Sequence, residues 1–172
     1  SRHHPRRLPW RSLRTVRPSQ PGNVLQASNK EQISSWMAPL DKKIRIGSWN
    51  IGSLTGRARE LVDVMVRRKV KILGIQETKW KGNSARPVGE GYKVYYAGRT
   101  TRRNGVGIIL HPELQPNVIE VLRLSDRLMA RRLIMNGKIW HLVSGYAPQQ
   151  GCPEEENEAF RDLFEEHIRG VK

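Results

Sequence analysis

The sequence has 172 residues, which is enough for one domain with a hydrophobic core and too few for two such domains. Its 31 Lys and Arg residues against 16 Asp and Glu give a net charge of +15, which favours a polyanionic partner such as nucleic acid, although a solvated basic surface has the same composition. Cys152 is the only cysteine, which excludes an intrachain disulfide and a cysteine-rich zinc site, and no apolar run approaches the roughly 20 residues that span a membrane. We therefore expect a soluble, intracellular protein that does not bind membranes.

Residues 1–42 have the composition of a disordered basic tail. Six arginines occur by position 17, several prolines separate them, and few aliphatic residues recur periodically. Two functional interpretations are open: a nucleic-acid-binding arm, or a nuclear-import signal that would place the protein in the nucleus. Untranslated or junction sequence would give the same pattern. The folded domain is predicted to occupy residues 43–172.

The first folded segment has the pattern of a strand, a helix and a second strand. Ile44–Asn50 alternates like a strand, Thr55 offers a cap for a helix through Arg68, and Lys71–Gln76 is typical of a buried strand. The predicted apolar face of the helix consists of Leu61, Val62, Met65 and Val66. A unit of this length predicts parallel strands joined by a right-handed crossover, so that the carboxyl ends of both strands lie together.

Further strands are predicted along the rest of the chain. They are Tyr92–Ala97, Gly105–Leu110, Val118–Leu124, Arg131–Met135 and Lys138–Ser144. A polar, basic hairpin loop at 98–104 joins the first two, and Asn136-Gly137 is a strong hairpin signal between the last two. The sheet is therefore predicted to become antiparallel in this part.

A second helix is predicted after Pro153, because three glutamates follow the proline at the positive end of the helix dipole. Its buried stripe is expected to be Phe160, Leu163, Phe164 and Ile168. Together the elements predict an α/β (α+β) fold with a mixed sheet and helices on one face. The other face would also need a covering layer, and we expect that layer to belong to a missing C-terminal half.

Two polar residues stand where the first two strands end. Asn50 ends the first strand and Glu77 directly follows the second. The carboxyl ends of parallel strands are where open α/β sheets place ligands, and a single Glu there is sufficient to hold Mg²⁺ when water and phosphate complete the coordination. Alternatively, both side chains cap the strand ends and bind only loop backbone.

Four motifs in order, IRIGSWNIGSL, ILGIQETKW, GVGIIL and LVSGYAP, resemble the first half of the endonuclease/exonuclease/phosphatase superfamily. Within it they are similar to endonuclease domains of non-LTR retrotransposons and to craniofacial development protein 2-like sequences. The resemblance implies part of a four-layer α/β/β/α sandwich, a Mg²⁺ or Mn²⁺ cofactor, and cleavage of nucleic acid, DNA above all. It implies that Asn50 orients catalytic groups, that Glu77 is a metal ligand, and that Tyr146 contacts the scissile phosphate.

The sequence also departs from the pattern of this superfamily. Gly52 stands where several relatives place an acidic residue, and the GDFN-like and Ser-Asp-His motifs expected after the Phe160 helix do not occur in the 172 residues. We therefore expect the chain to be truncated and inactive alone, and whether it is an enzyme stays open. The alternatives are a non-catalytic basic nucleic-acid-binding fragment and a functionless retroelement remnant.

Several other residues were considered for the site. Trp80 and the loop arginines Arg99, Arg102 and Arg103 are candidates for contacts with a nucleic-acid backbone. His111 and His141 are interpreted as structural, because each lies in or at the end of a predicted strand. Ser125-Asp126-Arg127 is rejected as a counterpart of the terminal motif, because it comes too early and lacks a histidine.

Overall fold

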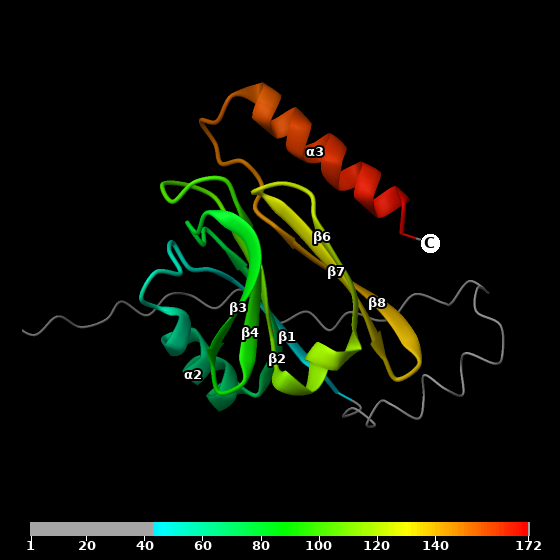
Figure 1. The fold of residues 1–172 in the computed structure, drawn as a ribbon. Coiled ribbons are helices and arrows are strands. Elements are labelled where there is room, and N and C mark those ends of the chain that lie inside the picture. The colour runs from blue at the N-terminus through cyan, green and yellow to red at the C-terminus, as the bar shows by residue number, and fades with distance from the viewer. Residues whose placement is uncertain (1–42, 172) are drawn as a thin grey trace, which may run out of the picture.

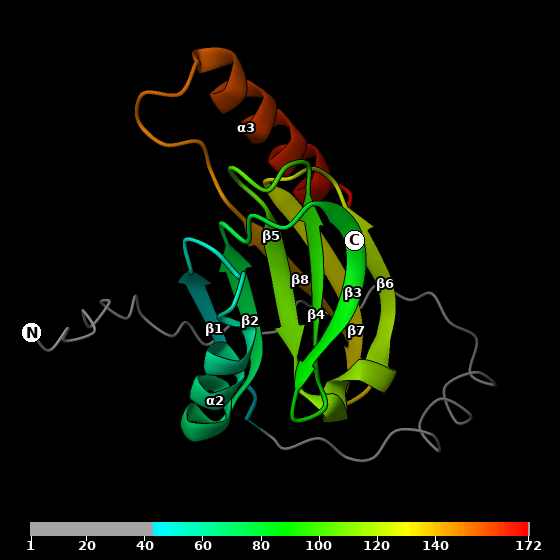
Figure 2. The same cartoon turned by 60° about the vertical axis from the view of Figure 1, so that its left-hand side comes forward.

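A computed structural model describes residues 43–171 of the chain, so the predicted basic tail lies outside the described residues. Within this range, eight strands form two sheets, and the helices are α2 and α3 with a short 3-10 helix, η1. Figures 1 and 2 show the two sheets face to face, with α2 on the outside of one and α3 on the outside of the other. No helix in the described part of the chain is long and apolar enough to cross a membrane.

The first sheet has the strand order β1-β2-β5-β4-β3. Its strands are β1 (Arg45–Asn50), β2 (Val70–Gln76), β5 (Val106–Leu110), β4 (Tyr92–Gly98) and β3 (Gly82–Gly89). β1 and β2 are parallel, as predicted, with Asn50 opposite Gln76. The other pairs are antiparallel. This register places the ends of β1 and β2 side by side at one edge of the fold.

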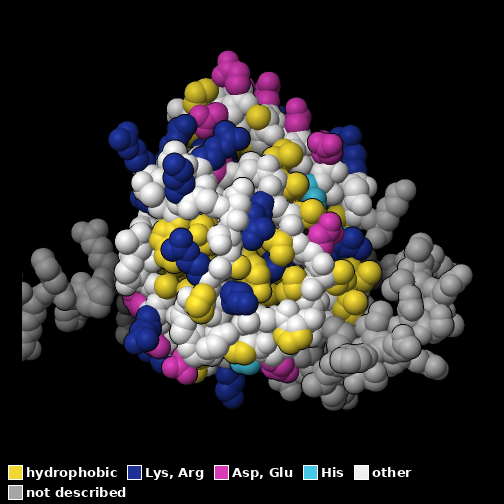
Figure 3. All heavy atoms as spheres, in the orientation of Figure 1, with side chains coloured by type: hydrophobic (Ala, Val, Ile, Leu, Met, Phe, Trp, Pro, Cys, Tyr) yellow, Lys and Arg dark blue, Asp and Glu magenta, His cyan; other side chains and the backbone are white. Residues whose placement is uncertain are grey.

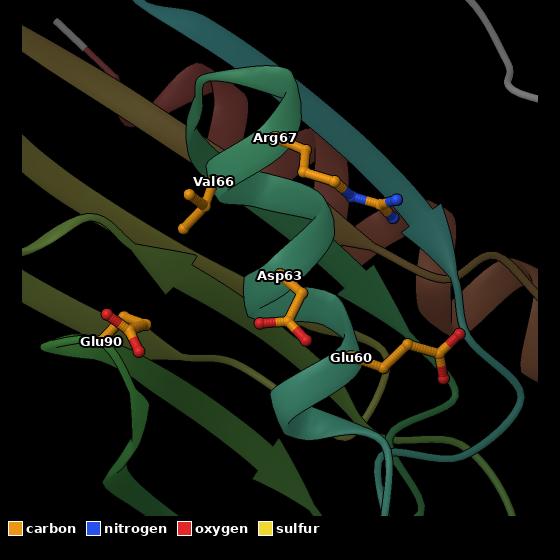
Figure 4. A pocket seen from close by; sticks show the side chains of 5 residues that line it. All are labelled: Glu60, Asp63, Val66, Arg67 and Glu90. Atoms are coloured by element: carbon orange, nitrogen blue, oxygen red, sulfur yellow. The ribbon is translucent and has the colours of Figure 1, made fainter.

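The helix α2 (Ala58–Arg68) connects β1 to β2 and covers the outer face of the first sheet. Leu61, Val62 and Met65 are buried there, as predicted. Two details of the prediction are wrong: the N-cap residue is Arg57 instead of Thr55, and Val66 is 50% exposed. The turn between β1 and α2 is longer than the sequence pattern indicated. Val66 lines a shallow hollow at the helix surface, which Figure 4 shows with Glu60, Asp63, Arg67 and Glu90.

The strand β3 was not predicted, because its sequence GNSARPVG is rich in residues that strands disfavour. It is the edge strand of the first sheet, and Pro87 lies beside an irregularity in its pairing with β4. The turn Glu90-Gly91 has φ values of 48° and 75°, the left-handed conformation that a tight hairpin needs. The tight turn and the pairing with β4 therefore hold this strand despite its composition.

The three strands after η1 (Pro112–Asn117) form a separate second sheet. They are β6 (Val118–Arg123), β7 (Leu128–Met135) and β8 (Lys138–Gly145), in the order β6-β7-β8. The predicted mixed sheet is confirmed for the first sheet, but the predictions that these strands extend it and that the helices share one face are wrong. The hairpin at Asn136-Gly137 is confirmed, with φ values of 51° and 72°. The layer that covers the inner face of the first sheet was expected to belong to a missing C-terminal half. These strands supply it instead. The core between the sheets contains Ile72, Ile108, Leu110, Met129, Leu133 and Leu142.

The helix α3 (Glu154–Arg169) begins after Pro153, as predicted. Its predicted buried stripe is wrong, because none of its 16 residues is buried. Phe164 is 38% exposed and Ile168 is 45% exposed. Leu163 faces a groove of about 550 Å³ between α3 and the outer face of the second sheet, which Leu122, Leu124 and His141 also line. Figure 1 shows α3 running along this outer face.

Candidate functional site

The three principal site residues predicted from the sequence meet at one point. Asn50 ends β1, Glu77 directly follows β2, and Tyr146 directly follows β8. The side-chain amide of Asn50 donates a hydrogen bond to Oε1 of Glu77 at 2.9 Å, and the Tyr146 hydroxyl donates to the same oxygen at 2.7 Å. The site therefore joins two adjacent strands of the first sheet to the end of a strand in the second.

The backbone of Glu77 has a left-handed conformation, with φ of 58°. A residue other than glycine in this conformation costs about 1 kcal/mol or more, and such strain concentrates at functional sites. The next residue, Thr78, is buried, and its backbone N–H donates to the carbonyl of Gly105 at 3.1 Å. This turn ends β2 abruptly and leaves the Glu77 carboxylate at the sheet edge.

The hydrogen bonds determine the ionisation of both groups. The Tyr146 hydroxyl, then the Asn50 amide and the charge of Lys79, lower the pKa of Glu77 below its ordinary value against the effect of burial. Burial, followed by the hydrogen bond to Glu77, raises the pKa of Tyr146 to about 12. At neutral pH, Glu77 is therefore an anion and Tyr146 is a protonated hydrogen-bond donor.

Two further side chains contact Tyr146 and were not predicted as site residues. The Gln149 side-chain amide donates to the Tyr146 hydroxyl at 2.8 Å. Arg127 lies over the Tyr146 ring, with its guanidinium carbon 5.2 Å from the ring centroid, and donates to the Tyr146 carbonyl at 3.3 Å. Both residues lie in loops, where residue type gives little periodic signal. The sequence offered one clue, since Gln149 comes directly after the YAP motif.

A glutamate of α3 extends this cluster to the basic loop. Glu156 accepts a hydrogen bond from Arg127 at 3.1 Å, and its other oxygen lies 3.9 Å from the Arg103 guanidinium. Figure 3 shows Lys and Arg side chains gathered beside the acidic first turn of α3. Arg103 is thus connected to the site through Glu156 and Arg127. Arg99 and Arg102 are exposed on the same loop, and their contact with nucleic acid stays a prediction.

Trp80 lies mainly against the core. Its ring meets the buried Tyr96 ring edge to face at 5.2 Å, and its indole N–H donates to Thr55 at 3.2 Å. The Arg86 guanidinium carbon lies 5.4 Å from the centroid of the Trp80 ring. Because the side chain is only partly exposed, its proposed contact with nucleic acid also stays a prediction.

Three of the residues that the sequence interpretation set aside, His111, His141 and Asp126, do not reach the site. His111 accepts a hydrogen bond from the backbone of Glu113 at 3.2 Å and caps η1, so its structural role is confirmed. His141 lines the groove under α3. Asp126 accepts a hydrogen bond from the Asn104 amide at 3.0 Å. The neighbouring Arg127 is therefore the member of that triplet that contacts the site.

In the part of the chain that the structure describes, the site offers a single carboxylate, that of Glu77, as a ligand for a divalent cation. Between residues 43 and 171, no group of three or more His, Cys, Asp and Glu side chains could hold a metal. Mg²⁺ commonly takes only one or two carboxylates, with water and substrate phosphate as its other ligands. Glu77 fits this requirement, because it is ionised and both of its hydrogen bonds described above reach the same oxygen, Oε1. The donor set fits a cation held by a single protein carboxylate.

The fold and the sequence match known proteins. Residues 47–169 match the model of the "Endonuclease/Exonuclease/phosphatase family". Craniofacial development protein 2 is 33% identical over 120 residues in both Tragulus javanicus and Bos taurus. The match covers 67% of this chain and 20% and 19% of those proteins, respectively, so the chain spans about a fifth of their length.

Solved structures share the fold at low sequence identity. The "3'-5' exonuclease (NExo) from Neisseria Meningitidis" has a TM-score of 0.57 and 20% identity, over 72% of this chain and 51% of its own. An AP endonuclease from Archaeoglobus fulgidus has a TM-score of 0.57 and 19% identity, over 76% and 53%. D. rerio TDP2 "complexed with single strand DNA product" has a TM-score of 0.56 and 17% identity, over 77% and 57%. The chain therefore matches about half of each structure.

Proposed function

Because this chain belongs to the endonuclease/exonuclease/phosphatase family, we propose that Asn50, Glu77 and Tyr146 form part of a site that hydrolyses phosphodiester bonds in nucleic acid. The observation that carries this proposal is the Glu77 carboxylate, which is held between the Asn50 amide and the Tyr146 hydroxyl at the ends of three strands. These groups come from two sheets and from distant parts of the sequence. Their convergence on one oxygen atom suits a site for a cation and a phosphate.

The residues have distinct roles in this proposal. Glu77 would hold Mg²⁺ or Mn²⁺, which supplies stabilisation of the charge that develops on the phosphoryl oxygens. Asn50 holds the carboxylate in place by its hydrogen bond. The Tyr146 hydroxyl keeps its proton at neutral pH, because its pKa is raised to about 12, and would donate it to a phosphate oxygen in place of Glu77 when substrate binds. Gln149 orients that hydroxyl by donating to its oxygen.

We propose nucleic acid, and DNA in particular, as the substrate. The net charge of +15 favours a polyanion, Arg127 contacts Tyr146, and Arg103 is linked to Arg127 through Glu156. Two structures of similar fold contain DNA: Neisseria NExo is bound to a "product DNA hairpin", and D. rerio TDP2 is complexed with "single strand DNA product". The retrotransposon origin and the nuclear location stay predictions.

We expect the 172-residue chain, tested by itself, to bind nucleic acid without cleaving it. The site described here has one carboxylate, and His111 and His141 lie elsewhere in the described fold. A catalytic set that lacks some of its cooperating members keeps little of its rate, so we expect these groups alone to give no measurable cleavage.

The test compares the wild-type chain with Glu77→Gln in two assays. In the first, Mg²⁺ is titrated by calorimetry, and Glu77→Gln should weaken binding by more than about tenfold, because a direct ligand contributes at least as much as residues that only orient ligands. In the second, nicking of supercoiled plasmid with Mg²⁺ should not exceed the background of the variant. Glu60→Gln, which removes an exposed carboxylate of α2, is the matched control and should bind Mg²⁺ like the wild type.

Each outcome has a defined meaning. Equal Mg²⁺ binding by the wild type and Glu77→Gln would refute the role of Glu77. Nicking by the wild type that is lost in Glu77→Gln would support the site and contradict the expectation that this chain does not cleave.

A further inference from the structure

A cluster of polar side chains, of which Gln76 and Ser144 are buried and Ser48 is exposed, lies directly beneath the site. The Gln76 side-chain amide donates to the Ser48 hydroxyl at 3.2 Å and to the Ser144 hydroxyl at 3.4 Å. The Ser144 hydroxyl in turn donates to the Ile75 carbonyl at 3.3 Å. These residues belong to β1, β2 and β8, so the cluster links three strands from both sheets.

The three strands are the ones that carry the site. Ser48 comes two residues before the site residue of β1, and Ser144 comes two residues before Tyr146. Gln76 directly precedes Glu77. Residues two apart on a strand point to the same face, so Ser48 lies on the same side of its strand as Asn50, and Ser144 on the same side as Tyr146. The cluster therefore lies one step along the same three strands from the site. Movement of the cluster would therefore move the site.

Backbone pairing does not explain how β8 is aligned with the other two strands. β1 and β2 are joined by a parallel ladder, which fixes the Asn50 strand end relative to Gln76. β8 pairs with β7 in the other sheet, and it faces β2 across the core. The Gln76–Ser144 hydrogen bond crosses between the sheets at this point. It therefore restricts sliding of β8 over β2.

Because the Gln76–Ser144 hydrogen bond is buried, it favours one alignment of β8 with β2. Gln76 is 9% exposed and Ser144 is 2% exposed. A buried polar group that loses its partner costs about 1–3 kcal/mol, so displacement of β8 that breaks the link is disfavoured. The apolar contacts between the sheets have no comparable directionality. The Gln76–Ser144 bond thus contributes to the register of the two sheets below the site, together with the Ser144–Ile75 and Tyr146–Glu77 bonds.

We propose that Gln76 is a positioning residue, which sets Tyr146 against Glu77 by tying β8 to β2, whose ladder with β1 already aligns Asn50. The relevance of this role to catalysis rests on the proposed function, whereas the geometry does not. Gln76 touches neither the cation site nor the substrate in this proposal. It acts through the strands that carry the three site residues.

The alternative is that Gln76 only satisfies buried polar groups. In that case its replacement would lower stability and leave the site geometry of the folded protein unchanged. The two readings are separated by signals from the site itself. The side-chain amides of Asn50 and Gln149 report on the two sides, since one donates to Glu77 and the other to the Tyr146 hydroxyl.

The experiment measures solvent exchange of these two side-chain amides by nitrogen NMR in Gln76→Met. Methionine keeps the length of the side chain and loses both hydrogen bonds. We expect exchange of the Gln149 amide to accelerate by about tenfold, which corresponds to the loss of a typical hydrogen bond. Exchange of the Asn50 amide should change less, because the β1–β2 ladder holds that strand end. Ser144→Ala, which removes the same link from β8, should change the Gln149 amide in the same direction and should be non-additive with Gln76→Met.

Asn117→Leu is the matched control. Asn117 is also a buried amide, 6% exposed, and it donates to the Ile134 carbonyl at 2.9 Å at the opposite end of the second sheet. It should destabilise the fold and leave both site amides unchanged. Unchanged site amides in folded Gln76→Met, or an equal change in Asn117→Leu, would overturn the proposal. If Gln76→Met does not fold, unchanged Gln149 exchange in Ser144→Ala overturns it instead.

The readout needs neither metal nor nucleic acid. Equal Mg²⁺ binding by the wild type and Glu77→Gln would contradict the proposed function and leave the positioning role standing. Normal Mg²⁺ binding by Gln76→Met, together with unchanged site amides, would contradict only the positioning role.

Discussion

The helices α2 and α3 have similar apolar patterns and very different environments. In α2, Leu61 and Met65 are each 1% exposed, whereas no residue of α3 is buried and Ile168 is 45% exposed. α2 connects two parallel neighbours in one sheet, so the crossover must return over that sheet. α3 follows a loop after the last strand of the second sheet, and ion pairs of Glu156 tie its first turn to Arg127 and Arg103. A repeating pattern of apolar residues therefore predicts that a helix forms. The chain segments that connect the helix to its neighbours decide how deeply it is buried.

The largest expected effect tests this contrast with one substitution in two places. Leu61→Ala should lower the free energy of unfolding by about 2–5 kcal/mol, because it leaves a cavity in the core. Leu163→Ala in α3 should lower it by less than about 1 kcal/mol, since that side chain faces an open groove. Urea denaturation of both variants measures the difference. Equal losses would show that α3 is as firmly packed as α2.

The next test concerns the tether of α3. Glu156→Gln removes the partner of Arg127 and Arg103, so amide hydrogen exchange in α3 should accelerate by about threefold to tenfold while exchange in α2 is unchanged. The two arginines are then free for phosphate, and binding of an oligonucleotide should become tighter and more salt-dependent. Glu155→Gln removes the same charge from an exposed neighbour and is the control. A matching change in Glu155→Gln would attribute the effect to net charge alone.

The smallest expected effect concerns the hydrogen bond that joins the sheet beneath α2 to the sheet beneath α3. Tyr146→Phe removes the largest contribution to the lowered pKa of Glu77, so that pKa should rise toward 4.5. A lowered folded-state pKa stabilises the protein above the ordinary value of 4.5, and this contribution is lost as the pH falls through the folded-state pKa. The urea midpoints of the wild type and the variant should therefore differ at neutral pH and converge in acid. A difference that is independent of pH would contradict this coupling.

The parts of the fold that sequence reasoning recovered are those with local signals. The β1-α2-β2 unit and the Asn136-Gly137 hairpin follow from periodicity and turn chemistry. β3 was missed because its pairing overrides a poor strand composition. The alternation of apolar and polar residues could not show whether the strands after η1 extend the first sheet or form another. Both arrangements bury the same face of each strand. Arg131 is fully buried, with its guanidinium carbon 3.1 Å from the centroid of the Tyr95 ring, where the pattern gave no reason to expect a charge.

The site was predictable where a polar residue interrupts an apolar strand. Asn50 and Glu77 have that signal, whereas Tyr146 was indicated only by the family resemblance of the YAP motif, and the structure brings the three together. Arg127 and Glu156 become neighbours of Tyr146 only because the second sheet and α3 are folded as they are. Gln149 lies in a loop, where residue type is weakly constrained.

The hydrogen bond between Tyr146 and Glu77 joins residues 69 positions apart in the sequence. Hairpins such as β3–β4 and β7–β8 close short loops and form early, whereas a contact of this separation must wait for the two sheets to meet. Site assembly is therefore expected to be a late event in folding. A nascent chain that has formed its hairpins but not yet docked its sheets would hold Glu77 without its Tyr146 hydrogen bond, so the pKa of that carboxyl would still lie closer to its ordinary value.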